Sequence, residues 1–299
     1  MTSLTIGKRT LIWGERTYVM GILNLTPDSF SGDGLLAFEE VAPASALDRA
    51  RAFLAAGADI LDVGGESTRP GSAPVDAPEE LRRVIPSIQG IAAEFPDVLI
   101  SIDTSKAAVA EAAFAAGASI LNDVWALRAD PDLARVASKA GVPVVLMHNR
   151  SRPASIEVRE KLGNAYHGAE YADLIEDIKA ELMQSVDIAR RAGIPDDHII
   201  LDPGIGFGKT VPQNLELIDR LPEIRRLGFP VLLGPSRKSF IGYTLDLPPD
   251  QRLEGTAAAV SVGICRQADL IRVHDVEFMV RVARMTDAIV RVPTSSKIK

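Results

Sequence analysis

Polar and charged residues follow nearly every apolar run of this sequence that could form a buried strand. In chain order, they are Asn24, Glu66 with Arg69, Asp103, Asn122, His148, Asp202, the run Ser236-Arg237-Lys238, Arg272 and His274. One Asp or Asn at such a junction is more often a helix cap than a ligand-binding group. So many polar junctions at once predict a ring of hydrogen-bonding groups around a single mouth.

The ring contains both hydrogen-bond acceptors and cations. Its acidic and amide members include Asp103, Asn122 and Asp202, and its basic members include Arg69, Lys238, Arg272 and His274. Carboxylates pair well with the adjacent N–H groups of an amidine-like edge. Arginine and lysine bind anions, arginine through its planar fork of donors. The ring therefore suits a ligand with a planar, hydrogen-bonding head and a phosphate-bearing tail.

The segments that must position these groups alternate between two kinds. Apolar runs typical of buried parallel strands occur at residues 19–24, 59–63, 99–103, 119–122, 142–147, 199–202, 231–234 and 270–273. Stretches of helical character occur at residues 44–56, 79–94, 107–116, 132–140, 171–192, 213–221, 253–266 and 276–289. Such βα units within about 250 residues are typical of an α/β fold of the (β/α)₈ or TIM barrel type, in which ligands bind at the C-terminal ends of the strands. A doubly wound open sheet is the alternative.

The remaining segments fit one domain. Residues 4–7 and 10–13 predict a short N-terminal β-hairpin that could close the bottom of the barrel. The polar residues 149–167 predict an extended loop over one face. No composition shift or linker divides the chain, so we expect a single domain over residues 1–292 and a flexible tail at 293–299.

Composition narrows the class of protein. The chain has 299 residues, 46% of them hydrophobic, and a net charge of −7. This acidic balance argues against a nucleic-acid-binding protein, which usually carries a basic footprint. Cys265 is the only cysteine, so no intramolecular disulfide can form, as expected of a cytoplasmic protein. No uncharged apolar stretch reaches the roughly 18 residues of a membrane span, and Cys265 itself is expected to be a small buried residue of a helix.

Several familiar motifs fail on their spacing. Residues 203–210, PGIGFGKT, resemble a phosphate-binding loop, but the Walker pattern requires glycine at the position of Pro203. The glycines lack the dinucleotide-binding spacing as well, so we interpret the segment as a tight turn that lets backbone approach a ligand. The histidines are scattered along the chain, which argues against a zinc site held by the protein alone. A G-x-S-x-G nucleophile elbow is absent from the sequence.

Seven segments form a combination that is more specific than any one of them. They are GILNLTPDSF at 21–30, DVGGESTRPG at 62–71, SIDTS at 101–105, NDV at 122–124, DPGIGFGK at 202–209, GPSRKS at 234–239 and RVHDV at 272–276. Together they resemble the dihydropteroate synthase family. The resemblance implies a (β/α)₈ barrel that forms a homodimer and takes part in folate biosynthesis. The implied reaction joins 7,8-dihydropterin-6-ylmethyl diphosphate to 4-aminobenzoate and releases diphosphate, with Mg²⁺ as cofactor and with sulfonamides, which mimic 4-aminobenzoate, as inhibitors.

The resemblance also implies a role for each matching residue. Asp103, Lys238 and Arg69 match the family's catalytic groups. The pterin pocket is matched by Asp103, Asn122, Asp202, Lys238 and Met147, the diphosphate site by Asn24, Arg69, Arg272 and His274, and the 4-aminobenzoate site by Thr68, Phe30, Phe207 and Ser236. Asn24 also matches the family's ligand to Mg²⁺. Residues 26–34 and 67–73 correspond to two mobile loops that complete the site, and diphosphate is expected to leave before the arylamine attacks.

The sequence departs from the family pattern at three places, and two other functions share part of that pattern. Residues 31–34 read SGDG where the family commonly has SDGG, residues 149–153 stand where many members have M-Q-G, and Gln213 stands where histidine is common. A pterin-dependent methyltransferase would share the barrel and the pterin-binding residues but needs no diphosphate site. A paralogue that binds pterin without catalysis would keep both sites.

Overall fold

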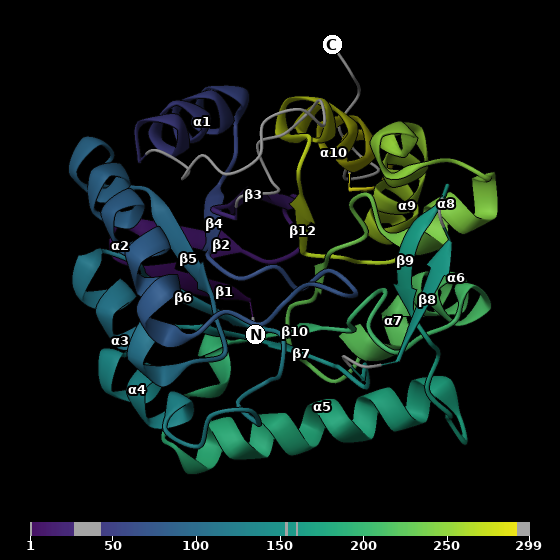
Figure 1. Ribbon diagram of the computed structural model, residues 1–299, viewed down its shortest axis with the longest axis horizontal. Coiled ribbons are helices and arrows are strands. Elements are labelled where there is room, and N and C mark those ends of the chain that lie inside the picture. The colour runs from purple at the N-terminus through teal and green to yellow at the C-terminus, as the bar shows by residue number, and fades with distance from the viewer. Residues whose placement is uncertain (1, 27–42, 153–154, 160, 292–299) are drawn as a thin grey trace.

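The computed structural model describes residues 2–26, 43–152, 155–159 and 161–291. Within them, eight parallel strands form one sheet with helices packed around it (Figure 1). The strands are β3 (Tyr18–Asn24), β4 (Ile60–Gly64), β5 (Leu99–Asp103), β6 (Ile120–Asp123), β7 (Val144–Met147), β10 (Ile199–Asp202), β11 (Leu232–Leu233) and β12 (Leu270–Val273). The sheet closes into a barrel where β10 meets β11, because Leu201 N donates to Pro230 O at 2.9 Å and Leu201 pairs with Val231. The predicted (β/α)₈ barrel is confirmed, and each predicted strand is present.

Helices connect the strands at the predicted places. They are α1 (Pro43–Ala56), α2 (Ala77–Glu94), α3 (Ala107–Ala116), α4 (Leu133–Ala140), α5 (Leu174–Arg191), α6 (Val211–Asp219), α7 (Leu221–Arg225), α8 (Ser239–Leu245), α9 (Leu253–Cys265) and α10 (Val276–Val290), with 3₁₀ turns at Asp196–His198 and Pro249–Gln251. The helices that the sequence patterns did not reveal are α7 and α8. They have five and seven residues, which is too short to show a helical period clearly.

Local signals set where the helices begin and end. Asp173 accepts hydrogen bonds from two backbone N–H groups of the first turn of α5, both at 3.0 Å, so the helix begins after it rather than at Tyr171 as predicted. Thr210 and Gln213 form a capping box at the start of α6. Gln213, which departs from the family pattern, therefore stabilises the start of the helix that follows the glycine-rich segment.

The inside of the barrel is filled in layers. Because side chains of a strand alternate between its two faces, every second residue points inward. The lowest layer is apolar and buried, and consists of Met20, Ile60, Leu99, Ile120, Val145, Ile200, Leu232 and Leu270. The N-terminal hairpin, formed by β1 (Ser3–Ile6) and β2 (Arg9–Ile12), packs Leu4, Leu11 and Trp13 against this layer. The predicted hairpin is confirmed, and it covers the bottom of the barrel.

Two residues further along each strand, most inward positions are polar. The polar ones are Asp62, Ser101, Asn122, Asp202 and Arg272, and the others are Ile22, Met147 and Gly234. Another layer follows at the strand ends, where the register places Asn24, Gly64 and Asp103 side by side. An apolar plug therefore supports a polar mouth at the C-terminal ends of the strands, which is where ligands bind in barrels of this kind.

The segment at residues 149–167 is not simply the loop that the sequence predicts. It contains an antiparallel hairpin of β8 (Ile156–Arg159) and β9 (Gly163–Tyr166), in which Ile156 pairs with Tyr166. The turn between the strands uses Gly163 in the left-handed conformation, with φ at 70°. Each strand has four residues, IEVR in β8 and GNAY in β9, so neither gives the continuous apolar run that marks the barrel strands.

Cys265 is exposed, which contradicts the prediction that it is buried. It is the last residue of α9 and lines a groove on the outside of the barrel between α9 and α10. Because α9 is rich in small apolar residues on all sides, its sequence does not show which of its faces meets the barrel.

No helix in the described part of the chain is long and apolar enough to cross a membrane. The predicted tail at residues 293–299 lies outside the described residues.

Candidate active site

The floor of the mouth is built around Arg272 on β12. Its Nε donates to Asp62 Oδ2 at 2.6 Å, and its Nη2 donates to Asp103 Oδ2, also at 2.6 Å. Asn122 Nδ2 donates to the same oxygen of Asp62 at 3.2 Å. Burial raises the pKa of Asp103 to about 7, and Arg272 opposes that rise. Burial also lowers the pKa of Arg272, but Asp62 and Asp103 more than offset this effect and keep the guanidinium charged.

Asp62 is the central residue that sequence reasoning missed. Its side chain is fully buried, and Oδ1 has no hydrogen-bond partner among the described residues. Functional side chains are expected at the ends of the strands, and Asp62 lies two residues before the end of β4. A signal was nevertheless present, because Asp62 follows the inward-facing Ile60 by two residues and must point to the same side.

Asp202, at the end of β10, supplies a third buried carboxylate. Gly204 N donates to Asp202 Oδ1 at 2.7 Å, whereas Oδ2 has no donor among the residues that the structure describes. Burial raises the pKa of Asp202 to about 6, and the bond from Gly204 opposes the rise. Asp202 pairs in register with Met147 and shares the polar layer with Asn122. Asn122, Met147 and Asp202, three of the residues that the sequence predicts to line one pocket, therefore lie together.

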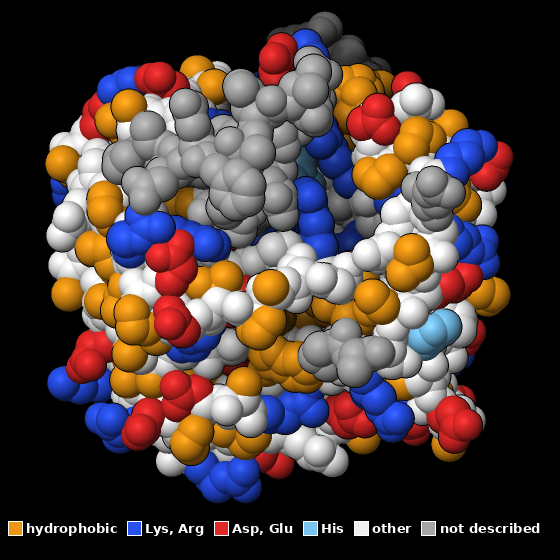
Figure 2. Space-filling view, in the orientation of Figure 1, with side chains coloured by type: hydrophobic (Ala, Val, Ile, Leu, Met, Phe, Trp, Pro, Cys, Tyr) orange, Lys and Arg blue, Asp and Glu red, His pale blue; other side chains and the backbone are white. Residues whose placement is uncertain are grey.

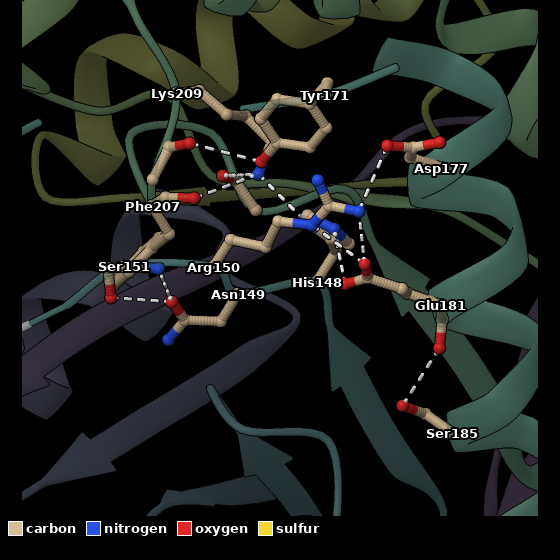
Figure 3. Close-up of polar contacts among 12 residues, drawn as sticks. His148, Asn149, Arg150, Ser151, Tyr171, Asp177, Glu181, Ser185, Phe207 and Lys209 are labelled. Carbon is tan, nitrogen blue, oxygen red and sulfur yellow. Dashed lines mark hydrogen bonds and ion pairs between the residues drawn. The ribbon is translucent and has the colours of Figure 1, made fainter. Parts of the chain in front are cut away.

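Lys209 holds the glycine-rich segment that follows Asp202 (Figure 3). Its Nζ donates to Gly204 O at 2.9 Å and to Phe207 O at 3.1 Å, and it lies 3.0 Å from His148 Nδ1. A protonated lysine can only donate, so Nδ1 accepts and the imidazole proton is assigned to Nε2. Burial lowers the pKa of Lys209 to about 7. The lysine that makes this segment look like a phosphate-binding loop thus points into the protein and fixes the turn.

Charged residues behind His148 complete this support. His148 Nε2 lies 3.1 Å from Glu181 Oε2, and Arg150 Nε donates to Glu181 Oε1 at 2.8 Å. Burial lowers the pKa of His148 to about 4, so the ring is neutral. Gly208, with φ at 70°, packs directly on the backbone of Arg150, where any side chain would collide. Arg150 and Ser151, which lie where the sequence departs from the family pattern, therefore brace the glycine turn.

A second group of cations lies on the other side of the floor. Figure 2 shows a hollow in which Lys, Arg and His side chains gather. Lys238 Nζ lies 4.0 Å from the centroid of the Phe207 ring, as in a cation–π contact. Burial and then Arg272 lower the pKa of Lys238 to about 8. The charge of Arg69 also lowers the pKa of Lys238, so these three cations share one region of positive potential.

His274 is held next to these cations by Ser236. The Ser236 hydroxyl accepts a hydrogen bond from His274 N at 3.2 Å and lies 3.0 Å from Nδ1, to which it can donate. Burial and then the Arg272 charge hold the pKa of His274 well below its usual range. The ring is therefore neutral, and in the tautomer in which Ser236 donates to Nδ1 its proton lies on Nε2, where an anion can accept it.

Strained backbone sets the direction of these side chains. Arg237, between Ser236 and Lys238, has φ at 57°, which is uncommon for a residue with a side chain. Thr256 Oγ1 accepts from Arg237 N at 3.1 Å, and Asp275 accepts from the Arg237 guanidinium. Strain of this kind, held by surrounding bonds, is typical of functional sites.

The remaining predicted residues lie around the same mouth or outside the described structure. Asn24 ends β3 beside Gly64. Thr68 and the exposed Arg69 lie in the segment after β4, and Phe207 is buried beside Lys238. Phe30 and residues 27–34 of the first loop, including the altered SGDG sequence, lie outside the described residues.

Comparison with known proteins identifies relatives of this chain. A family described as "Pterin binding enzyme" matches residues 20–274. A dihydropteroate synthase from Clostridium beijerinckii is 49% identical over 96% of this chain and 100% of its own length.

Solved structures agree with this match. A dihydropteroate synthase from Clostridium difficile, crystallised in the presence of pteroic acid, is 46% identical, with a TM-score of 0.82 over 94% of this chain and 99% of its own. A Xanthomonas albilineans dihydropteroate synthase with 4-aminobenzoic acid is 38% identical, with a TM-score of 0.85 over 98% and 99%. The chain therefore belongs to the pterin binding enzyme family, among whose members it matches dihydropteroate synthases over nearly its whole length.

Proposed function

We propose that this protein is a dihydropteroate synthase whose active site is the mouth centred on Arg272. It would join 7,8-dihydropterin-6-ylmethyl diphosphate to 4-aminobenzoate, giving 7,8-dihydropteroate and diphosphate. The observation that carries this proposal is that buried acids and a cluster of cations meet at one guanidinium, since Arg272 bonds both Asp62 and Asp103. A ligand with a hydrogen-bonding head and an anionic tail would satisfy both groups.

The acidic side suits the pterin ring. Asp202 Oδ2 and the Asn122 amide lie in one buried layer, where they can pair with the N–H and carbonyl groups on the edge of the ring. Met147 in the same layer supplies an apolar contact for the face of the ring. A ring without these groups would leave buried polar atoms unpaired, at a cost of about 1–3 kcal/mol for each.

The cationic side suits diphosphate. Arg69, Lys238 and the Nε2 proton of His274 would stabilise the charge that develops as diphosphate leaves. The described residues contain no group of three or more His, Cys, Asp or Glu side chains that could hold a metal ion. Mg²⁺ needs no such cage, because it commonly binds one or two protein oxygens together with substrate phosphates. The Asn24 side-chain oxygen, at the mouth, fits that role, and the bound ion would neutralise part of the diphosphate charge.

We expect the order of bond changes that the resemblance to dihydropteroate synthases implies. The bond between the exocyclic methylene carbon and the diphosphate oxygen breaks first, and its electron pair leaves with diphosphate. The pterin ring system and the nearby Asp103 carboxylate stabilise the methylene cation that remains. The nitrogen lone pair of 4-aminobenzoate then forms the new C–N bond, and the nitrogen loses one proton. An arylamine already has a free lone pair, so the site needs no strong base.

The arylamine would enter beside Phe207, with Thr68, Ser236 and Phe30 as the further residues expected there. Phe207 is well placed for this contact because Lys238 already lies over its ring. The hydroxyl of Ser236 is hydrogen-bonded to His274, so Ser236 would connect the arylamine site to the diphosphate site.

The cation cluster also helps to distinguish a synthase from the alternative functions. A pterin-dependent methyltransferase has no use for a diphosphate site, so Arg69, Lys238 and His274 favour the synthase. A pterin-binding paralogue without catalysis would bind both substrates and release no dihydropteroate, which the activity assay below distinguishes.

We further infer a homodimer formed through the groove between α9 and α10. Exposed apolar side chains line both helices, including Val262, Phe278, Met285 and Ile289. Contiguous apolar surface of this kind is typical of protein interfaces. A second copy would cover the groove symmetrically, as closed dimers do.

Two expectations from the sequence complete the proposal. We place the protein in the cytoplasm, which the single cysteine supports, and we treat residues 1–292 as one domain.

The first prediction concerns Asp103. Replacing it with alanine removes the carboxylate nearest the reacting carbon, so kcat for dihydropteroate formation should fall by about 100-fold or more. Dihydropteroate and released diphosphate are measured with Mg²⁺ and both substrates. Asp97→Ala is the matched control, because this exposed residue precedes the same strand at the opposite end of the barrel. Wild-type turnover in Asp103→Ala, or no product from the unmodified protein, would contradict the proposal.

The second prediction is a pH dependence of pterin binding. Because the pKa of Asp202 is raised to about 6, its carboxylate accepts hydrogen bonds above that pH and loses this capacity as it takes up a proton below it. The affinity for a dihydropterin should therefore fall roughly tenfold per pH unit below about pH 6. Calorimetric titration between pH 5 and 8 measures this. Asp202→Asn should bind weakly and show a shallower dependence, because Asp103 still titrates in this range, and an equally steep dependence in that variant would refute the assignment.

The third prediction concerns the dimer. Met285→Arg places a charge in the apolar groove and should shift the protein from a dimer to a monomer of 32.0 kDa in light scattering. Arg284→Glu changes a charge on α10 outside the groove and should leave the dimer intact. As a second measure, Cys265 should react with a thiol reagent faster in the Met285→Arg variant. A monomeric unmodified protein would disprove this interface.

A further inference from the structure

The β8–β9 hairpin is fixed to the barrel by contacts with α8 and with the segment before α9. Arg252, which is buried, donates from Nη2 to Leu162 O at 2.6 Å. Tyr243 donates from its hydroxyl to Gly163 O at 3.2 Å, and the Arg159 guanidinium lies 4.3 Å from the centroid of the Tyr243 ring. In Figure 1 the hairpin lies beside α8. These contacts hold the hairpin against the barrel near its turn.

One strand of the hairpin, β9, also contacts the segment that carries Thr68 and Arg69. The Tyr166 hydroxyl donates to Thr68 O at 3.2 Å, and Asn164 Nδ2 donates to Pro70 O at 3.3 Å. These bonds hold the backbone on both sides of Arg69. The segment would otherwise depend on its own short contacts, such as the bond between the hydroxyls of Ser67 and Ser72.

The same tyrosine contacts the other side of the mouth. Its ring is stacked on the Phe207 ring, with centroids 6.1 Å apart and planes 29° apart. Lys238 lies over Phe207, so Tyr166, Phe207 and Lys238 form a continuous wall. Burial raises the pKa of the Tyr166 hydroxyl, which keeps it protonated and able to donate to Thr68.

We propose that the β8–β9 hairpin positions the arylamine site, with Tyr166 both forming its aromatic wall and fastening the segment that carries Thr68. This proposal deepens the proposed function and rests on it. The hairpin contacts neither Asp202, Asn122 nor Arg272 in the described structure, so its effect should fall on the arylamine rather than on the pterin. Tyr166 and Asn164 are thus positioning residues, because they act through Phe207 and residues 67–73.

The test separates the two contributions of Tyr166. Tyr166→Phe keeps the ring and removes the bond to Thr68, whereas Tyr166→Ala removes both. We expect KM for 4-aminobenzoate to rise about threefold in Tyr166→Phe and Asn164→Ala, and about tenfold or more in Tyr166→Ala. KM for the pterin diphosphate should rise less than threefold in each variant. Val158→Thr is the control, because Val158 is on the same hairpin, is 67% exposed and should change neither KM.

Hydrogen exchange provides a readout that does not depend on turnover. Amide protection in residues 67–73 should fall several-fold in Tyr166→Phe and in Asn164→Ala, while the barrel strands keep theirs. An unmodified protein that forms no dihydropteroate would refute the proposed function, and the exchange comparison would still test the fastening role. The proposal is overturned if Tyr166→Ala leaves KM for 4-aminobenzoate within twofold of the unmodified protein, if both KM values rise equally, or if protection of residues 67–73 is unchanged.

Discussion

The site depends on one buried guanidinium that holds two carboxylates. Asp62 and Asp103 point into the same mouth, and without Arg272 their charges would repel each other in a place with little water. Removing one partner of such a buried group commonly costs 3–5 kcal/mol, because the other charge stays buried and unpaired. After burial, the same guanidinium also lowers the pKa of Lys238 and of His274, so it affects the cationic side of the mouth as well as the acidic side. Arg272 is thus the point at which the pterin and diphosphate sites become one.

The glycine turn that borders the mouth is likewise fixed by contacts within the protein before a ligand arrives. Lys209 is buried, yet three acceptors surround its amine, and the neutral His148 connects it to Glu181. These contacts hold the turn that carries Asp202 and Phe207 without using any group that a ligand would need. Groups fixed in this way need little rearrangement as charge develops, which is the main source of electrostatic catalysis.

Much of the fold could be predicted because strong local signals specify it. The barrel strands are buried apolar runs, and their polar ends fall in register, so residues such as Asp103 and Asn122 could be placed together from the sequence. Asp62 could have been found by counting inward positions from Ile60 instead of looking only at strand ends. The β8–β9 hairpin has four-residue strands without a continuous apolar run and depends on tertiary contacts such as Arg252 with Leu162, which leave no periodic signal. The exposure of Cys265 depends on which side of α9 meets the barrel, and a uniformly small-residue helix does not reveal that.

The most direct test of this account is the affinity of Arg272→Met for a pterin that carries no phosphate. Calorimetry would compare binding of 6-hydroxymethyl-7,8-dihydropterin to the unmodified protein, Arg272→Met and Arg69→Met, with circular dichroism to verify folding. The account predicts that Arg272→Met loses about tenfold or more in affinity, because Asp62 and Asn122 lose the group that orients them, while Arg69→Met binds as the unmodified protein does. Unchanged pterin affinity in a folded Arg272→Met variant would show that Arg272 serves diphosphate alone and would contradict the account.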